Sequence, residues 1–346
     1  SITTMTSATK VFTELWSELT PRQKEILTGR FGLDKSGERQ TLAALGARYG
    51  VTRERVRQIE AAGIALLKTK IASDMTSEEM VARTRKFLKE NGGVAREEAL
   101  LADLNKFVDG LTRNHLALFL ESSKSFFHYP EDRHFASFYY LDKEHLKTAT
   151  AFIQQWASVL KSKRNEIFGG HYGKELEAFV KKSGIPAMHA ASWLSITKKI
   201  TTSSYGDVGL AEWAEIQPKT VRDRIYLTLK KKGEPLHFRA IAKLINEQGL
   251  ARPASAPTVH NELIKDERFV LVGRGTYALA EHGYEPGTAR EVIERILKKN
   301  GALRPKDIML AVLKERFFKP NTILVNLQNK SFFKRLGDGT YKVRES

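Results

Sequence analysis

The sequence predicts a mainly α-helical, multidomain chain, in which an N-terminal helix-turn-helix is followed by tandem winged-helix units with small β-hairpin wings. Two observations predict this class. A glycine separates two stretches of helical apolar spacing near residue 50. An aromatic residue followed by Gly-x-Gly-Thr-Tyr occurs twice, with Tyr277 and Tyr341 64 residues apart. Short helices that lead into a hairpin with a glycine turn are typical of a winged helix, and the spacing fits one small domain per repeat. Two further hairpins are expected, at residues 126–141 and 201–215.

The bulk composition indicates a globular chain with an affinity for polyanions. The 346 residues are 41% hydrophobic and 28% charged, and 57 Lys and Arg against 40 Asp and Glu give a formal net charge of +17. Nucleic acid is the polyanion that such a chain most often meets, although a basic solvated surface is the alternative. The charge is uneven: residues 287–346 hold 14 basic and 6 acidic side chains, whereas residues 76–216 hold 19 and 18. The neutral middle suggests spacers or protein-binding modules.

Several function classes are disfavoured by what the sequence lacks. It has no cysteine, which excludes disulfides, thiolate metal sites and a cysteine nucleophile. It has no apolar run of the ~20 residues that a membrane span needs. No HExxH motif or paired His spacing occurs, and "GGHYGKE" (169–175) lacks the spacing and the Ser/Thr of a phosphate loop. We therefore expect no catalytic residue, metal, cofactor, small-molecule substrate or membrane, and an intracellular, soluble protein.

The N-terminal helix-turn-helix is predicted from residues 41–66. Leu42, Leu45 and Tyr49 fall at helical spacing, and Gly50 can adopt the positive φ that ends a helix. Thr52 is a good N-cap for a second helix. The inner side of that helix is predicted to comprise Val56, Ile59, Gly63 and Leu66. The outer side is predicted to comprise Arg53, Glu54, Arg57 and Gln58.

The residue types on this outer side suit base recognition in the major groove of DNA. Arginine can bind guanine in a bidentate manner, glutamate can accept a hydrogen bond from cytosine, and glutamine can pair with adenine. A glutamate would not favour simple phosphate binding. The alternative is a solvated helix that is stabilised by its own Glu–Arg pairs.

Two stretches, "LTPRQKEILTGRFGL" (19–33) and "TLAALGARYGVTRERVRQIE" (41–60), resemble region 4 of sigma-70 type RNA polymerase initiation factors. The resemblance covers residues ~12–70. It implies recognition of a −35 promoter element and contact with the flap of the polymerase β subunit. By position it assigns Arg53, Glu54, Arg57 and Gln58 to base contacts and Arg55 to phosphate or polymerase. With the N-cap included, the expected DNA-binding set is Thr52, Arg53, Glu54, Arg55, Arg57 and Gln58.

The rest of the chain departs from that family. Nothing resembles sigma region 2, and about 275 residues follow the region 4-like segment, so we do not expect the chain to initiate transcription alone. Within the unit assigned to residues 217–286, "PLHFRAIA" and the Gly-Thr-Tyr wing are similar to the HARE-HTH family, which includes the delta subunit of bacterial RNA polymerase. His237 is expected to cap a helix there. The expected core comprises Leu236, Phe238, Ile241, Leu244 and Ile245.

The last unit carries a cluster of basic residues around its expected recognition helix and wing. Lys330, Lys334 and Arg335 are the residues that we expect to bind DNA phosphates, and a solubilising surface is the alternative. The other members of the cluster are Arg304, Lys306, Lys319 and Lys342. By contrast, "LTRNHLALFLESSKSFF" (111–127) resembles a recognition helix with few basic groups, so a protein contact is expected there.

These observations predict five units, at residues 1–74, 75–142, 143–216, 217–286 and 287–346. The favoured hypothesis is a non-enzymatic bacterial transcription protein, located in the cytoplasm with the nucleoid, which binds double-stranded DNA and acts near RNA polymerase. A DNA-binding subunit of a restriction or defence system is one alternative. A protein-binding adaptor built of winged helices is the other.

Overall fold

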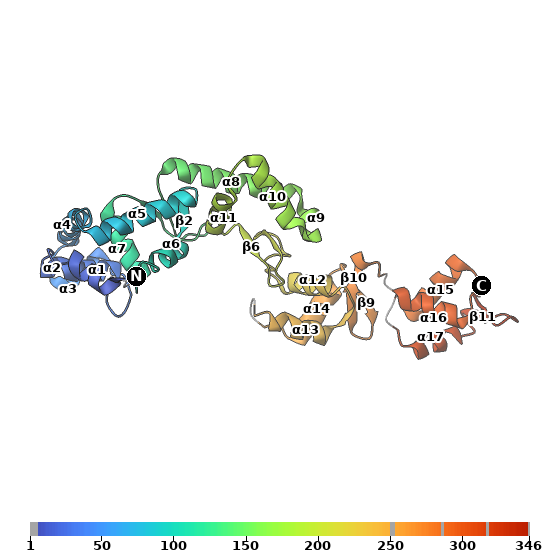
Figure 1. Cartoon of the computed structure of the whole chain (residues 1–346). Coiled ribbons are helices and arrows are strands. Elements are labelled where there is room, and N and C mark those ends of the chain that lie inside the picture. The colour runs from blue at the N-terminus through green and yellow to red at the C-terminus, as the bar shows by residue number, and fades with distance from the viewer. Residues whose placement is uncertain (1–5, 250–252, 285–286, 316–317, 345–346) are drawn as a thin grey trace. The chain divides into compact units, whose positions relative to one another are not determined.

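A computed structural model describes residues 6–249, 253–284, 287–315 and 318–344 (Figure 1). The chain divides into two compact units, which are described separately. The first contains the described residues up to Thr201 together with Val208–Leu210, and the second contains Thr202–Asp207 and the described residues from Ala211 onward. Both are mainly helical with small sheets, which confirms the predicted mainly α class. None of the helices described is both long and apolar enough to cross a membrane.

The first unit opens with a group of four helices. Its elements are β1 (Thr6–Ser7), α1 (Ala8–Leu15), α2 (Pro21–Phe31), α3 (Leu42–Tyr49) and α4 (Arg53–Ile71). Threonines at positions 20, 41 and 52 cap α2, α3 and α4, because each side chain accepts a hydrogen bond from a backbone N–H in the first turn. Gly50 ends α3 with φ 64°, as predicted.

A second group of helices follows and ends in a β-hairpin. Its elements are α5 (Met75–Glu90), β2 (Val94–Arg96), α6 (Glu97–Leu104), β3 (Val108–Asp109), α7 (Arg113–Ser123), β4 (Phe127–Tyr129) and β5 (Phe138–Tyr140). The strands form a sheet in the order β2-β5-β4. The pairing of β4 with β5 confirms the hairpin that was predicted within residues 126–141.

One hydrophobic core joins these two groups. It contains residues of α1, α2 and α4 together with residues of α5, α6 and α7. Helix α7 is apolar on all sides: its five consecutive residues from Leu116 to Leu120 are buried, and it packs against α2 and α4. At its start, the Asn114 amide donates to the carbonyl oxygens of Gly32 (2.8 Å) and Gly37 (3.0 Å). These contacts hold α7 against the chain's own N-terminal helices, and the protein contact expected for residues 111–127 stays a prediction.

The first unit closes with α8 (Lys143–Ser162), α9 (Arg164–Glu166), a π-helical turn (Ile167–His171), α10 (Tyr172–Ser183), α11 (Ala187–Ile196), β6 (Ile200–Thr202) and β7 (Val208–Leu210). The pairing of β6 with β7 confirms a hairpin that was predicted near residue 201. Helices α8 and α11 pack on β2, where the Trp193 indole N–H donates to the Gly92 carbonyl at 3.1 Å. Residues 169–175 are helical, and no strand precedes them.

The second unit contains two further groups with separate hydrophobic cores. The first group consists of α12 (Val221–Lys232), β8 (Leu236–His237), α13 (Phe238–Glu247), α14 (Ala256–Lys265), β9 (Phe269–Gly273), β10 (Thr276–Leu279) and a 3-10 turn (Ala280–His282). The other consists of α15 (Ala289–Asn300), α16 (Pro305–Glu315), α17 (Pro320–Leu327), β11 (Phe333–Arg335) and β12 (Tyr341–Val343). The pairings of β9 with β10 and of β11 with β12 confirm both predicted Gly-Thr-Tyr hairpins.

The same order of elements recurs along the chain. Helix, strand, two helices and a hairpin follow one another in residues 221–279, and residues 75–140 have the same order with the short strand β3 inserted between the two helices. In residues 289–343 a single bridge between Leu303 and Tyr341 stands where the first strand would be. In the middle copy, His237 caps α13 by accepting a hydrogen bond from the Arg239 N–H, as predicted. Of its predicted core, Ile241 and Ile245 are buried, whereas Leu236, Phe238 and Leu244 are only half-buried.

Candidate nucleic-acid interface

The turn between α3 and α4 fixes the start of the predicted recognition helix. Gly50 takes a left-handed conformation, and the N–H of Val51 donates to the Gly46 carbonyl at 3.0 Å. Gly46 faces this turn so closely that a Cβ there would lie 2.8 Å from the Val51 carbonyl oxygen. The two glycines therefore permit a turn that is tighter than other residues allow.

Gly46→Ala should accordingly destabilise the helix-turn-helix by about 1–3 kcal/mol, the usual cost of overpacking. The contacted atom belongs to the backbone, so the turn must shift to relieve the clash. The change is measured as a lower thermal midpoint together with weaker DNA binding. Gly173→Ala is the matched control, because nothing lies within 4 Å of a Cβ at that helical position. An unchanged midpoint for Gly46→Ala would show that the turn relaxes freely.

Helix α4 is held against α2 and α3 by a small core and one polar link. Val56 is fully buried against Ile26 and Leu45. The Arg30 guanidinium, which is partly buried on α2, binds the Glu60 carboxylate at 2.9 Å and the Gln40 carbonyl at 2.7 Å. These contacts fix the rotation of α4 about its axis and so determine which side chains face outward.

One part of the predicted inner side is wrong. Leu66 is 37% exposed, whereas Ile64, Leu67 and Ile71 are buried. At 100° per residue, Leu67 returns almost to the direction of Val56, while Leu66 points about 80° away from it. Val56 and Gly63 are buried and Ile59 is half-buried, as the pattern indicated.

The predicted DNA-binding set forms one exposed face on the first turns of α4. Every member is exposed, namely Thr52, Arg53, Glu54, Arg55, Arg57 and Gln58. Thr52 also caps the helix, since its side-chain oxygen accepts a hydrogen bond from the Arg55 N–H at 3.1 Å. The prediction that these side chains point away from the core is confirmed, and their contact with DNA stays a prediction.

Within this face, Glu54 and Arg57 bind each other. The Arg57 guanidinium donates to both carboxylate oxygens, from Nη2 at 2.6 Å and from Nε at 2.9 Å. This hydrogen bond lowers the pKa of Glu54 below its ordinary value and raises the pKa of Arg57. Arg55 donates to the Gln58 amide oxygen at 3.2 Å. The helix therefore has the Glu–Arg pair of the alternative interpretation, and Arg57 would have to release Glu54, or remain bound to it, while binding a base.

The three basic residues predicted in the last unit lie together. Lys330, Lys334 and Arg335 are exposed and line a cavity of about 800 Å³ beside β11 and β12. Lys342 also lines this cavity, and so does Arg344, which the sequence analysis missed. Arg344 directly follows the second strand of the hairpin, two residues after Lys342. Because side chains two residues apart in an extended chain lie on the same face, this spacing could have placed Arg344 beside Lys342. Arg304, Lys306 and Lys319 do not line the cavity.

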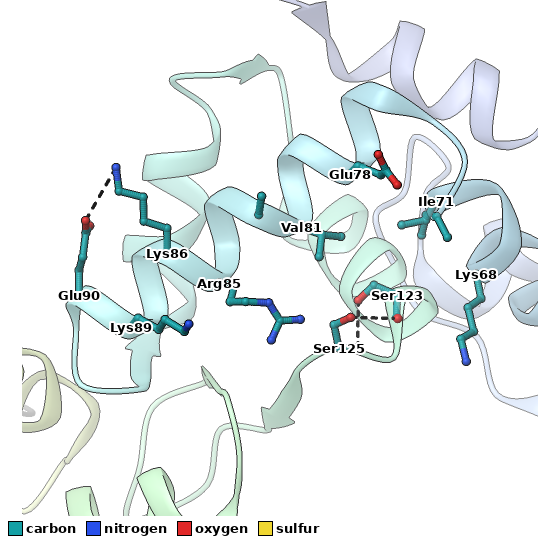
Figure 2. Close-up of a pocket in the computed structure, with 12 residues that line it drawn as sticks. Lys68, Ile71, Glu78, Val81, Arg85, Lys86, Lys89, Glu90, Ser123 and Ser125 are labelled. Atoms are coloured by element: carbon teal, nitrogen blue, oxygen red, sulfur yellow. Dashed lines mark hydrogen bonds and ion pairs between the residues drawn. The ribbon is translucent and has the colours of Figure 1, made fainter.

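A different kind of cavity, of about 630 Å³, lies between the end of α4, α5 and the end of α7 (Figure 2). Its apolar lining is provided by Ile71, Ala72, Val81 and Ala82. Charged side chains also line it, namely Lys68, Glu78, Arg85, Lys86, Lys89 and Glu90, of which Lys86 pairs with Glu90 at 3.9 Å. Sequence reasoning missed this groove because its residues come together only through the shared core. Among the described residues, no group of three potential metal ligands occurs.

Comparison with known proteins locates the similarity in the N-terminal helices. The sigma-70 region 4 family matches residues 17–69. The sigma factor RpoD of Neisseria gonorrhoeae is 42% identical over 69 residues, which are 20% of this chain and 11% of that protein. SigA of Clostridium acetobutylicum is 46% identical over 55 residues, or 16% of this chain and 14% of its own length. The sigma-B factor of Nostoc sp. is 48% identical over 54 residues, or 16% of each chain.

This chain thus spans only about a tenth to a sixth of the length of the relatives that it matches. The matched segment includes the glycine turn, the buried Val56 and the whole exposed face of α4. Residues 17–69 are a sigma-70 region 4-like domain with a helix-turn-helix, within a longer chain.

Proposed function

We propose that this protein is a non-enzymatic bacterial transcription protein whose region 4 domain reads promoter-type DNA near RNA polymerase in the cytoplasm. The observation that carries the proposal is the exposed face of α4, which a region 4 helix-turn-helix holds clear of the core. A polar helix face of this kind, on the second helix of the motif, is suited to the major groove.

The residues on this face divide between positioning and base recognition. Arg53 and Arg55 are proposed to bind phosphates, and Thr52 lies at the helix N-terminus, where the backbone N–H groups favour an anion. Arg57 is proposed to bind guanine and Glu54 to accept from cytosine, while Gln58 suits adenine. Because Glu54 gains nothing from a phosphate, its role on DNA is selection of a base pair.

The remainder of the chain is proposed to be an array of winged-helix units, with the boundaries predicted from the sequence and with a HARE-HTH-like unit at residues 217–286. The recurring order of helix, strand, two helices and hairpin supports this proposal. Because α1, α2 and α4 share one core with α5, α6 and α7, the described parts of the first two units are proposed to act as one rigid part of the array.

A polymerase contact is proposed to use the groove in Figure 2. The apolar sides of α2 and α4 are already covered by α7, so a partner helix cannot dock there without displacing it. The groove remains open beside α4, α5 and α7 and has an apolar lining with four basic and two acidic side chains around it. The apolar lining of this groove also favours a second candidate function, a protein-binding adaptor.

Capture of core RNA polymerase by the full chain, with and without duplex DNA, tests the proposed function. Ala82→Arg should reduce this capture, because Ala82 is exposed and lines the groove, and a long side chain would fill it. Ala62→Arg is the matched control, since Ala62 is exposed on α4 and does not line that groove. Steeply salt-dependent duplex binding without any capture would support a DNA-binding subunit outside transcription. Equal loss with both variants would show that the groove is not the contact.

A further inference from the structure

The β11–β12 hairpin carries positive side chains that repel one another. Lys334 and Lys342 are directly opposite each other in the antiparallel register. Like charges at opposed positions destabilise a sheet. The two lysine side chains have no ion pair or hydrogen bond with another described residue, and the same holds for the side chains of Lys330 and Arg335.

The described acidic residue nearest in sequence does not neutralise this cluster. Asp338 lies in the turn of the hairpin, where its carboxylate accepts hydrogen bonds from the hydroxyl (2.7 Å) and backbone N–H (3.0 Å) of Thr340. These bonds lower the pKa of Asp338, so its carboxylate stays ionised and hydrogen-bonded to Thr340 within the turn. Among the described residues, the cavity beside the hairpin is lined by five basic side chains and by no acidic one.

The basic side chains surround a concave surface that is partly pre-organised. Arg344 donates from Nη1 to the Lys330 carbonyl at 2.7 Å, which ties the end of β12 to the segment before β11. A guanidinium has five N–H donors, so this bond leaves Arg344 able to bind an anion as well. The cavity of about 800 Å³ is therefore held in shape by contacts that do not consume its positive charge.

The ligand chemistry follows from what the cavity exposes. The apolar residues Leu327 and Phe333 in its lining are each only 2% exposed, so the half-buried Tyr341 is the main aromatic surface left for an amphipathic peptide. In the groove of Figure 2, by contrast, the lining residues Ala72 and Ala82 are exposed and Val81 is half-buried. Several cations around one concave surface suit a polymer of phosphates, in which each contact releases a condensed counterion.

We infer that the β11–β12 hairpin forms a phosphate cradle for the backbone of duplex DNA, in which Lys342 and Arg344 act together with Lys330, Lys334 and Arg335. The cradle binds without sequence preference, because phosphates carry no base information. It gives the chain a second DNA contact that is independent of α4. The inference therefore goes beyond the proposed function, which rests on the region 4 domain.

Lys342→Glu in the full chain provides a test with opposite effects on stability and binding. A carboxylate opposite Lys334 replaces a repulsion by an attraction, so the thermal midpoint should stay the same or rise. Affinity for random-sequence duplex DNA should fall several-fold at ~0.1 M salt. The slope of log K against log salt should decrease by about 1–2, as expected for one or two lost phosphate contacts.

Lys314→Glu is the matched control, because Lys314 is exposed on α16, does not line the cavity and gives the same change in net charge. The inference is overturned if this control weakens binding as much as Lys342→Glu, or if Lys342→Glu leaves affinity and salt slope unchanged. A fall in affinity together with a lower thermal midpoint would also contradict it, since damage to the fold would then be the cause. Loss of sequence preference in an Arg57 variant tests the α4 proposal separately, so either can fail alone.

Discussion

Replacing Leu118 with alanine should destabilise the region 4 domain, although Leu118 lies outside it in the sequence. Leu118 is 1% exposed and belongs to the core that α7 shares with α1, α2 and α4. It follows Asn114, which binds Gly32 and Gly37, by one helical turn and so lies on the same side of α7. Removing a buried leucine side chain costs about 2–5 kcal/mol, because the cavity that it leaves does not close completely.

Hydrogen exchange is the measurement that distinguishes shared from local destabilisation. Amides of residues 42–60 and of residues 113–123 should lose protection by a similar factor in Leu118→Ala, since α2 and α4 each contribute both to the small core around Val56 and to the core that contains Leu118. Leu263→Ala is the matched control: Leu263 is also 1% exposed but belongs to the separate core of the second unit. That variant should leave residues 42–60 unaffected. If residues 42–60 kept their protection in Leu118→Ala, the region 4 domain would be stable without α7.

Much of the local structure could be predicted from the sequence because its signals are local. Gly50 and Thr52 marked the turn and the cap of α4, and glycine-rich motifs marked the hairpins. Helical periodicity placed Arg53 and Arg57 on the exposed side. The assignment of Leu66 to the inner side was wrong because 100° per residue brings Leu67, and not Leu66, into line with Val56.

The long-range packing could not be predicted because the sequence of one segment does not indicate which other segment it packs against. A helix that is apolar all round must be buried, and residues 116–120 of α7 show this property in the sequence. The pattern does not reveal that α2 and α4 are what cover it. The groove in Figure 2 has the same origin, since α4, α5 and α7 bring its residues together. The opposition of Lys334 and Lys342 likewise depends on the register of the hairpin.

Replacing Arg57 with alanine should weaken binding to the preferred DNA site on the order of tenfold to a hundredfold and change binding to random DNA much less. This is the effect expected of a bidentate contact to one base pair. Stability should hardly change, because the ion pair of Arg57 with Glu54 is exposed. The loss of Arg57 also leaves the Glu54 carboxylate without its partner, which adds repulsion from the DNA backbone.

Two further variants distinguish the effect of base recognition on DNA binding from the effect of net charge. Arg83→Ala removes another exposed arginine, one that pairs with Glu79 on α5, and should not alter the preference for a site. Glu54→Ala should leave total affinity nearly intact or raise it, while relaxing the preference at about one base pair. If Glu54→Ala and Arg83→Ala had the same effect, Glu54 would have no role in selection.

Selection of bound duplexes from a random pool, with the wild type and with Arg57→Ala and Glu54→Ala, tests the proposal that α4 reads DNA most directly. We predict that the wild type enriches one motif and that each variant loses preference at its own position within that motif. Enrichment of no motif by the wild type, with duplex binding retained, would contradict the account and would make the region 4 domain a docking module.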